Sequence, residues 1–334
     1  MKILSRDFLD SKTDTCHAAT ISFYRDEPVF AWFGGTQEGN TDSSIYIQFK
    51  NEILCIGENH SVAYWNPILF TVDNKGEEEL FLAYKRGEFC DRWQTYISNL
   101  SSIGDKDIKV PKPQIIPAGL NFCVKTKPVF DSNRHIICGS SVETKDDWTS
   151  YIETYDYYNG EFILDSRSKP LTVPKHKFVY HHPYHGKVSQ ITSGIIQPSL
   201  WFDKNNILHA FFRSSRGLGK VYHSQKNRSD YAVDWCMPHP IEHLDNPNSG
   251  IDTLYINEKL YLVHNPSDTF RHPLVLSELN NDFEVVDQIE IQYETKGGTS
   301  TKELSYPYMV ENEGKIHLVY TYGRVKIEYV TIEL

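Results

Sequence analysis

The sequence lacks three features that often identify a protein class: a long apolar run, closely spaced cysteines and a helical hydrophobic period. No segment approaches the roughly 20 apolar residues of a membrane helix, and the N-terminus has no apolar stretch of signal-peptide length. The six cysteines stand far apart, mostly inside apolar runs, and without a CxxC pair they predict buried thiols rather than a zinc site or a disulfide framework. We therefore expect a chain that is cytoplasmic as written and does not insert into membranes. Extracellular action stays open for a phage product or a trimmed chain.

An excess of basic residues is also absent. The 34 Lys and Arg are outnumbered by 44 Asp and Glu, which gives a formal net charge of −10. This charge argues against nucleic acid or an anionic membrane as a partner, so any bound anion must be met by a local basic patch. The run 181–185, with three histidines, has no Cys or carboxylate at ligand spacing. We expect no metal there and no cofactor elsewhere.

What the sequence does contain is short runs of aromatic and β-branched residues, broken by clusters of Gly, Asn, Asp and Pro. The runs fall into six groups: 18–23, 29–33 and 44–49; 62–70, 80–84 and 93–98; 122–130, 135–140, 149–155 and 162–165; 195–202, 207–213 and 221–224; 251–256, 260–264, 273–277 and 284–286; and 305–310, 315–320 and 325–332. A repeat of about 50 residues with three or four strands predicts an all-β, six-bladed β-propeller, because radial closure protects the sheet edges. We expect residues 1–334 to form this single domain. A β-sandwich or jelly roll is the competing fold.

Eight segments, taken in order, carry a resemblance to a known family: 16–21, 31–39, 66–69, 125–128, 196–200, 213–217, 246–252 and 305–307. Together they resemble the sialidase-like BNR-repeat (Asp-box) propellers, specifically the bacterial branch often labelled exo-α-sialidase. The resemblance spans nearly the whole chain and implies a propeller of the sialidase type. The Asp-box turns that mark many relatives are degenerate here, since segment 224–235 keeps the terminal Trp235 and little else.

Members of that family hold the substrate carboxylate with three arginines, and guanidinium groups suit this task because they pair bidentately and keep their charge. The resemblance places Arg213 and Arg271 at the second and third arginine positions. It also places Tyr306 at the position of the nucleophile and Asp42 at or near that of the acid/base residue.

Two positions depart from the family pattern. His17 stands where the first arginine is expected, and Gln197 replaces the Glu that activates the tyrosine. A neutral amide cannot accept the phenol proton, and an ordinary tyrosine has a pKa of about 10. The standard retaining mechanism of sialidases is therefore in question.

The remaining residues suit acid/base chemistry beside a carboxylate, since His17 can exchange a proton near neutrality and Tyr306 can donate one. The leading prediction is an exo-acting glycoside hydrolase, an atypical sialidase-like enzyme, that cleaves an acidic oligosaccharide or polysaccharide next to a carboxylated sugar. One alternative is a polysaccharide lyase that β-eliminates a uronic-acid glycan; another is a glycan-binding propeller without catalysis. The resemblance allows all three, because similar propellers include polysaccharide lyases and a glycosidase that releases rhamnose from glucuronate.

Four further residues are predicted to bind substrate: Gln197, Glu38, Lys127 and Asn248, with Arg324 in reserve. Each prediction has a structural alternative. Glu38, Asn248 and Asp42 lie in segments with turn composition, and His17 follows an apolar cysteine and could belong to the core. Lys127 could lie on a solvated edge. The two arginines could form scaffold ion pairs with Asp252 or Asp268.

Overall fold

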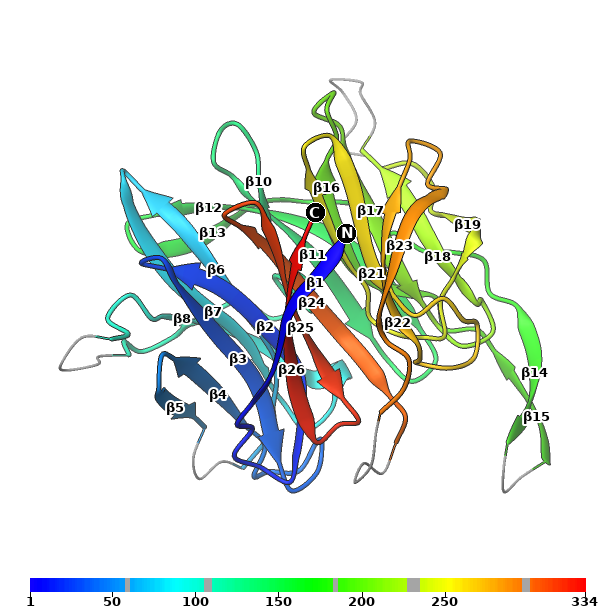
Figure 1. The fold of residues 1–334 in the computed structure, drawn as a ribbon, viewed down its shortest axis with the longest axis horizontal. Helices are drawn as coiled ribbons and strands as arrows, with labels where there is room; N and C mark the ends of the chain where they lie inside the picture. The colour runs from blue at the N-terminus through cyan, green and yellow to red at the C-terminus, as the bar shows by residue number, and fades with distance from the viewer. Residues whose placement is uncertain (58–60, 105–109, 183–185, 227–234, 296–300) are drawn as a thin grey trace.

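A computed structural model describes residues 1–57, 61–104, 110–182, 186–226, 235–295 and 301–334. Over these ranges the strands form six antiparallel four-stranded sheets and one separate two-stranded hairpin. Figure 1 shows the sheets set side by side around a common centre, where the first strand of the first sheet contacts those of the second and sixth, and the first strand of the fifth contacts those of the fourth and sixth. The predicted all-β, six-bladed propeller is confirmed.

The first three blades follow one another in chain order. They consist of β2 (Thr15–Tyr24), β3 (Glu27–Gly35), β4 (Ser44–Phe49) and β5 (Glu52–Ile56); β6 (Tyr64–Asn74), β7 (Glu77–Arg86), β8 (Gln94–Asn99) and β9 (Gln114–Ile115); and β10 (Val129–Phe130), β11 (Ile136–Glu143), β12 (Trp148–Tyr158) and β13 (Glu161–Arg167). A short 3₁₀ helix, η1 (Cys90–Arg92), interrupts the second blade.

The second half of the chain adds the hairpin and three more blades. The hairpin is β14 (Lys177–His182) and β15 (Gly186–Ile191). The blades are β16 (Ile195–Phe202), β17 (Leu208–Ser214), β18 (Lys220–Gln225) and β19 (His239–Asp245); β20 (Asp252–Ile256), β21 (Lys259–His264), β22 (Leu274–Leu279) and β23 (Val285–Gln292); and β24 (Leu304–Asn312), β25 (Lys315–Tyr322) and β26 (Lys326–Glu333).

The sixth blade takes its outer strand from the other end of the chain. Strand β1 (Lys2–Leu9) pairs antiparallel with β26, so Lys2 lies opposite Glu333 and the two ends of the chain lie side by side (Figure 1). This pairing ties the first segment of the chain to the last blade. It also covers the edge of β26, which would otherwise expose unpaired backbone groups.

Four inner strands share a local distortion that shapes the centre of the propeller. Ala18, Asn66, Gln197 and Tyr306 have φ between 43° and 56°, and each lies at a register shift in the pairing of the first strand with the second. A bulge of this kind turns a side chain out of the regular alternation of the strand. Left-handed φ at residues other than glycine costs on the order of 1–3 kcal/mol and is concentrated at functional sites.

Apolar side chains fill the spaces between neighbouring blades. The largest cluster includes Trp32, Phe70, Phe122, Tyr155 and Tyr308, all nearly or fully buried, and it joins parts of the first, second, third and sixth blades. Full burial of each such aromatic contributes about 2 kcal/mol. The inner strands therefore rest on a rigid core that fixes the residues at the centre.

Candidate functional site

Arg213, at the end of β17, lies at the centre of a neutral hydrogen-bonded group. Its Nη1 donates to the phenol oxygen of Tyr306 (3.0 Å) and to Oε1 of Gln197 (3.1 Å), and its Nε and Nη2 donate to Oδ1 of Asn248 (2.9 and 2.7 Å). The guanidinium carbon lies 5.4 Å from the centre of the Trp148 ring. Arg213 is only 5% exposed, and among the described residues no carboxylate forms an ion pair with it.

Tyr306 and Gln197 meet because the bulges of β24 and β16 turn them toward each other. Gln197 Nε2 donates to the phenol oxygen across 3.2 Å. The phenol oxygen therefore receives two hydrogen bonds, one from this amide and one from Arg213, so its own proton points elsewhere. The structure thus brings together four residues that the sequence assigned to the site: Arg213, Gln197, Asn248 and Tyr306.

Arg271 belongs to a chain of charges that runs beside this group. Its Nη2 donates to the backbone oxygen of Asn248 (2.7 Å), and its Nη1 pairs with Glu303 (2.8 Å). Arg324 Nε pairs with the other oxygen of Glu303 (2.8 Å), and Arg324 Nη1 pairs with Glu38. Burial lowers the pKa of Arg271, whereas its two carboxylate partners raise the pKa of Arg324 above its ordinary value, against the opposing effect of burial.

The chain of charges is balanced, whereas Arg213 beside it is a cation without an ion-pair partner among the described residues. Arg271 and Arg324 have Glu303 and Glu38 as partners, whose pKa values stay below the ordinary value despite burial because of the neighbouring cations. Arg213 has neutral partners. A buried guanidinium without a counter-ion is costly, and a carboxylate delivered by a ligand would remove that cost.

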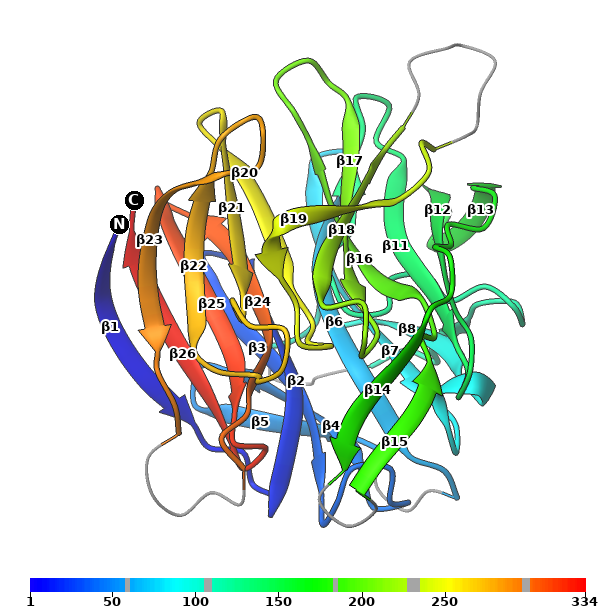
Figure 2. The ribbon, with the colours of Figure 1, turned by 90° about the vertical axis from the view of Figure 1, so that its right-hand side faces the viewer.

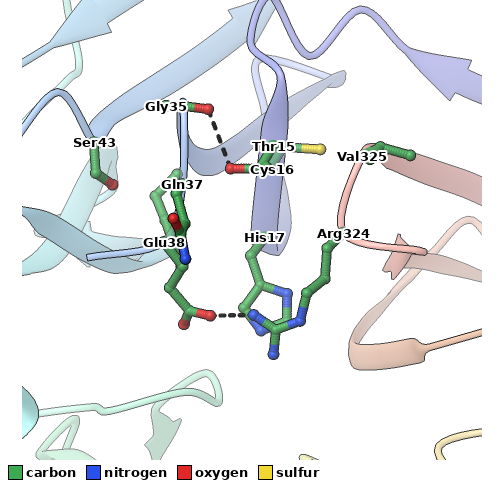
Figure 3. A pocket seen from close by; sticks show the side chains of 10 residues that line it. Thr15, Cys16, His17, Gly35, Gln37, Glu38, Ser43, Arg324 and Val325 are labelled. Carbon is green, nitrogen blue, oxygen red and sulfur yellow. Dashed lines mark hydrogen bonds and ion pairs between the residues drawn. The ribbon is translucent and has the colours of Figure 1, made fainter. Parts of the chain in front are cut away.

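His17 lies beside Tyr306, with ring centres 4.3 Å apart, and lines a cavity of about 310 Å³. Figure 3 shows its ring, the carboxylate of Glu38 and the guanidinium of Arg324 directed into the same space. Neither ring nitrogen has a hydrogen-bond partner in the described part of the chain. Burial lowers the pKa of His17 to about 4, an effect that the charge of Glu38 opposes, so the imidazole is neutral near pH 7.

Glu143, at the end of β11, is a site residue that the sequence did not indicate. It is half-buried, and burial raises the pKa of its carboxyl, while the charges of Arg213 and Arg271 act in the opposite direction. Within the described ranges it forms no ion pair. A carboxyl whose pKa is raised by burial suits the role of a general acid.

Asp42, in contrast, lies in an exposed turn. Its Oδ2 accepts a hydrogen bond from the backbone nitrogen of Thr36 (2.9 Å), and this contact closes the loop between β3 and β4. Glu38 belongs to the same loop but reaches Arg324. The loop therefore brings Glu38 into the charged cluster and uses the Asp42 carboxylate to hold its turn.

Lys127 forms part of the scaffold. Its Nζ pairs with the fully buried Asp252 (2.8 Å), which also accepts hydrogen bonds from Ser199 and from the backbone of Met309. Asp252 thus neutralises Lys127 rather than the arginines. Neighbouring Lys125 is buried, and burial lowers its pKa to about 7.

The sequence also missed Glu303 and Trp148. Glu303 precedes Tyr306 by three residues, and that spacing was the one signal available for it. Trp148 and Glu143 are opposite each other in the pairing of β11 with β12, a relation that appears only once the register is known.

Metal binding finds no support in the described residues, where His, Cys, Asp and Glu nowhere gather in threes that could hold an ion. Within the run 181–185, residues 183–185 lie outside the described residues, as does most of the Asp-box remnant 224–235. In the described part, no helix is long and apolar enough to cross a membrane.

Comparison with known proteins gives one family match. The model of the family described as BNR repeat-like domain matches residues 28–318. A search of curated proteins finds no match.

Solved structures share the fold across nearly the whole chain. A protein of unknown function from Dyadobacter fermentans has a TM-score of 0.73 at 13% identity, covering 100% of this chain and 99% of its own. Trypanosoma rangeli sialidase in complex with the inhibitor DANA has a TM-score of 0.62 at 9% identity, covering 98% of this chain and 60% of its own. The same enzyme in complex with sialic acid has a TM-score of 0.59 at 12% identity, covering 99% of this chain and 57% of its own. The chain thus spans about three fifths of the sialidase chains, and these low identities establish a shared fold.

Proposed function

This chain belongs to the family of BNR repeat-like domain proteins, and from that premise we propose that it is a carbohydrate-active enzyme that cleaves a glycosidic bond next to a carboxylated sugar. Arg213 and Arg271 bind the carboxylate, and the substrate is an acidic oligosaccharide or polysaccharide. The sialidase-like fold supports the choice of a sugar.

The observation that carries the proposal is the unpaired charge of Arg213. Its guanidinium is buried, fixed by four hydrogen bonds to neutral groups, and has no carboxylate partner in the described part of the chain. A fixed guanidinium loses little conformational entropy on binding and matches a planar carboxylate. The site is thus prepared for one anionic group.

In the hydrolytic reaction, which we favour, the bond between the anomeric carbon and the leaving oxygen breaks, the hydroxyl of a water molecule replaces the leaving group, and the remaining proton of that water returns to the carboxylate that acted as the acid. Tyr306 lies beside the reacting carbon, where hydrogen bonds from Arg213 and Gln197 fix its phenol oxygen. A protonated carboxyl gives its proton to the leaving oxygen. Glu143 suits this step because burial raises the pKa of its carboxyl, and Asp42 is the alternative acid.

Elimination is the second candidate reaction, and the neutral state of the His17 imidazole favours it. A neutral imidazole with two free nitrogens can remove the proton on the carbon next to the carboxylate. Tyr306, 4.3 Å away between ring centres, would then protonate the leaving oxygen as a carbon–carbon double bond forms. Pairing of the carboxylate with Arg213 acidifies that C–H bond.

The test is a screen of sialosides and uronate oligosaccharides that reads new reducing ends and the ultraviolet absorbance of an unsaturated uronate. We expect turnover that Arg213→Ala reduces at least a hundredfold and that Arg134→Ala, a change at an exposed arginine in another turn, leaves unchanged. Reducing ends without absorbance indicate hydrolysis, and both together indicate elimination. Glycan binding without turnover would overturn the catalytic proposal.

A further inference from the structure

The longest segment of the chain without acidic residues lies between the third and fourth blades and includes the hairpin. Between Asp165 and Asp203 there is neither Asp nor Glu, but there are five Lys or Arg, in a protein whose formal net charge is −10. Such a segment is the local basic patch that an acidic protein needs in order to hold a polyanion.

This segment includes the hairpin of β14 and β15, which projects from the body of the propeller (Figure 2). Phe178 of the hairpin packs so closely on Gly217 that an added Cβ would lie 2.5 Å from its ring. The guanidinium carbon of Arg216 lies 4.8 Å from the ring centre of Tyr180. The hairpin is therefore fastened to the loop that follows Arg213.

A groove of about 990 Å³ lies between the hairpin and the loop 144–147 of the third blade. Its lining residues are Lys145, Asp146, Lys175, Lys177, Ser189, Gln190, Ile191 and Ser193. Lys175 pairs with Asp147 at 2.5 Å and so joins the loop to the base of the hairpin. Lys145 and Lys177 are exposed, and within the described ranges neither forms an ion pair.

Trp148 links the lining of the groove to the carboxylate site. The backbone oxygen of Ser193, which lines the groove, accepts a hydrogen bond from the backbone nitrogen of Trp148 (3.0 Å). The Trp148 ring in turn lies 5.4 Å from the guanidinium carbon of Arg213. One residue, Trp148, thus separates the buried arginine from the lysine-lined groove.

We propose that this groove binds the next acidic sugars of a polyanionic polysaccharide whose carboxylated sugar occupies the Arg213 site. This inference rests on the proposed function and extends it from a single acidic sugar to a chain with repeated negative charges. Lys145 and Lys177 meet the charges, and the hydroxyl of Ser189 and the amide of Gln190 meet sugar hydroxyls. The volume is at the upper end of ordinary ligand pockets of about 300–1,000 Å³, large enough for more than one sugar.

Charge alone would also fit a single-stranded nucleic acid, but the lining favours a glycan. Proteins that bind single strands stack the bases on aromatic side chains. The eight described residues that line the groove include no aromatic ring.

The test measures binding by titration calorimetry, with oligogalacturonates of increasing length from one sugar upward as the probe. Three variants are compared with the wild type: Lys145→Glu/Lys177→Glu in the groove, Lys75→Glu/Lys204→Glu at exposed turns of other blade edges, and Arg213→Ala. We expect wild-type affinity to rise with chain length. The groove variant should bind the single sugar like the wild type and the longest probe at least tenfold more weakly, with a reduced salt dependence. The turn variant should match the wild type.

The outcomes separate this inference from the proposed function. Equal affinity of the wild type and the groove variant for the longest probe would contradict the proposal that the groove binds further acidic sugars. Binding of the single sugar that does not depend on Arg213 would overturn the carboxylate site, whatever the groove does. A single-stranded oligonucleotide that binds through Lys145 and Lys177 more tightly than any oligogalacturonate would replace the glycan with a nucleic acid.

Discussion

The side-chain amide of Gln197 donates to the phenol oxygen of Tyr306 across 3.2 Å, from equivalent bulges in the fourth and sixth blades. The same oxygen accepts from Arg213 at 3.0 Å. A residue that donates to the phenol cannot remove its proton. Tyr306 is therefore held by two donors and not by a base, which separates this site from a tyrosine primed by a glutamate.

If the reaction is elimination, Tyr306→Phe should lower kcat about a hundredfold or more, within the usual range for loss of a group that transfers a proton, while KM changes little. The ring would still pack beside His17, and Arg213 would keep its hydrogen bonds to Gln197 and Asn248. Steady-state kinetics with the substrate found in the screen would measure this. A variant that keeps full kcat would remove Tyr306 from the chemistry.

His17 should titrate near pH 4, because burial lowers its pKa from 6.5 to about 4. If the imidazole is the base, kcat/KM rises with pH through a midpoint near 4, and His17→Gln abolishes the activity. The NMR signal of the His17 ring, absent in His17→Gln, reports the midpoint directly. A midpoint near 6.5 would contradict a buried, neutral imidazole.

The same shift affects stability. The folded pKa of His17 lies below the unfolded value, so the unfolded chain binds the proton more readily and acid favours unfolding. As the pH falls from above 6.5 to below 4, the free energy of unfolding of the wild type should decrease by about 3 kcal/mol relative to that of His17→Gln. Denaturant unfolding at several pH values checks both the sign and the range.

Glu143→Gln should lower kcat about a hundredfold and remove the decline of activity at high pH, since a general acid works only while it holds its proton. Burial raises the pKa of Glu143, which moves that decline above the range of an ordinary carboxyl. Asp42→Asn is the comparison, because Asp42 holds an exposed turn through Thr36. A larger loss of kcat in Asp42→Asn than in Glu143→Gln would identify Asp42 as the general acid instead.

The sequence predicts the blades well because their strands alternate or run apolar over five residues or more. Strand β1 was not predicted because all of its eight residues are exposed or half-exposed on the outer edge, where little apolar patterning is needed. The hairpin of β14 and β15 was not predicted from the sequence for the same reason. It packs on a loop, and none of its residues whose burial is described belongs to the core.

Within the site, the sequence indicates residues that match a family position and misses those defined by contact. Arg213, Gln197 and Tyr306 stand in recognisable strand contexts, and the structure joins them. Glu303 matters because it lies between Arg271 and Arg324, which come from different blades. The contact of Glu303 with both arginines depends on how two blades pack, and no spacing in the sequence predicts it.

Glu303→Gln tests whether the chain of charges holds the site together. The neighbouring cations keep the pKa of Glu303 well below its ordinary value, so the carboxylate stabilises the fold above the unfolded pKa of about 4.3, and this contribution is lost as the pH falls. Breaking the pair with Arg271 and Arg324 should cost about 3 kcal/mol near pH 7, since it leaves buried charge uncompensated.

The difference between the wild type and Glu303→Gln should shrink as the pH approaches 3, and urea unfolding at pH 7 and pH 3 measures it. Lys302→Gln is the matched control, because its partner Glu294 and its own amine lie in solvent. A difference that stays constant with pH would show that Glu303 acts through packing and not through its charge. In that case Arg271 and Arg324 would have to be held by their other contacts, with Asn248 and Glu38.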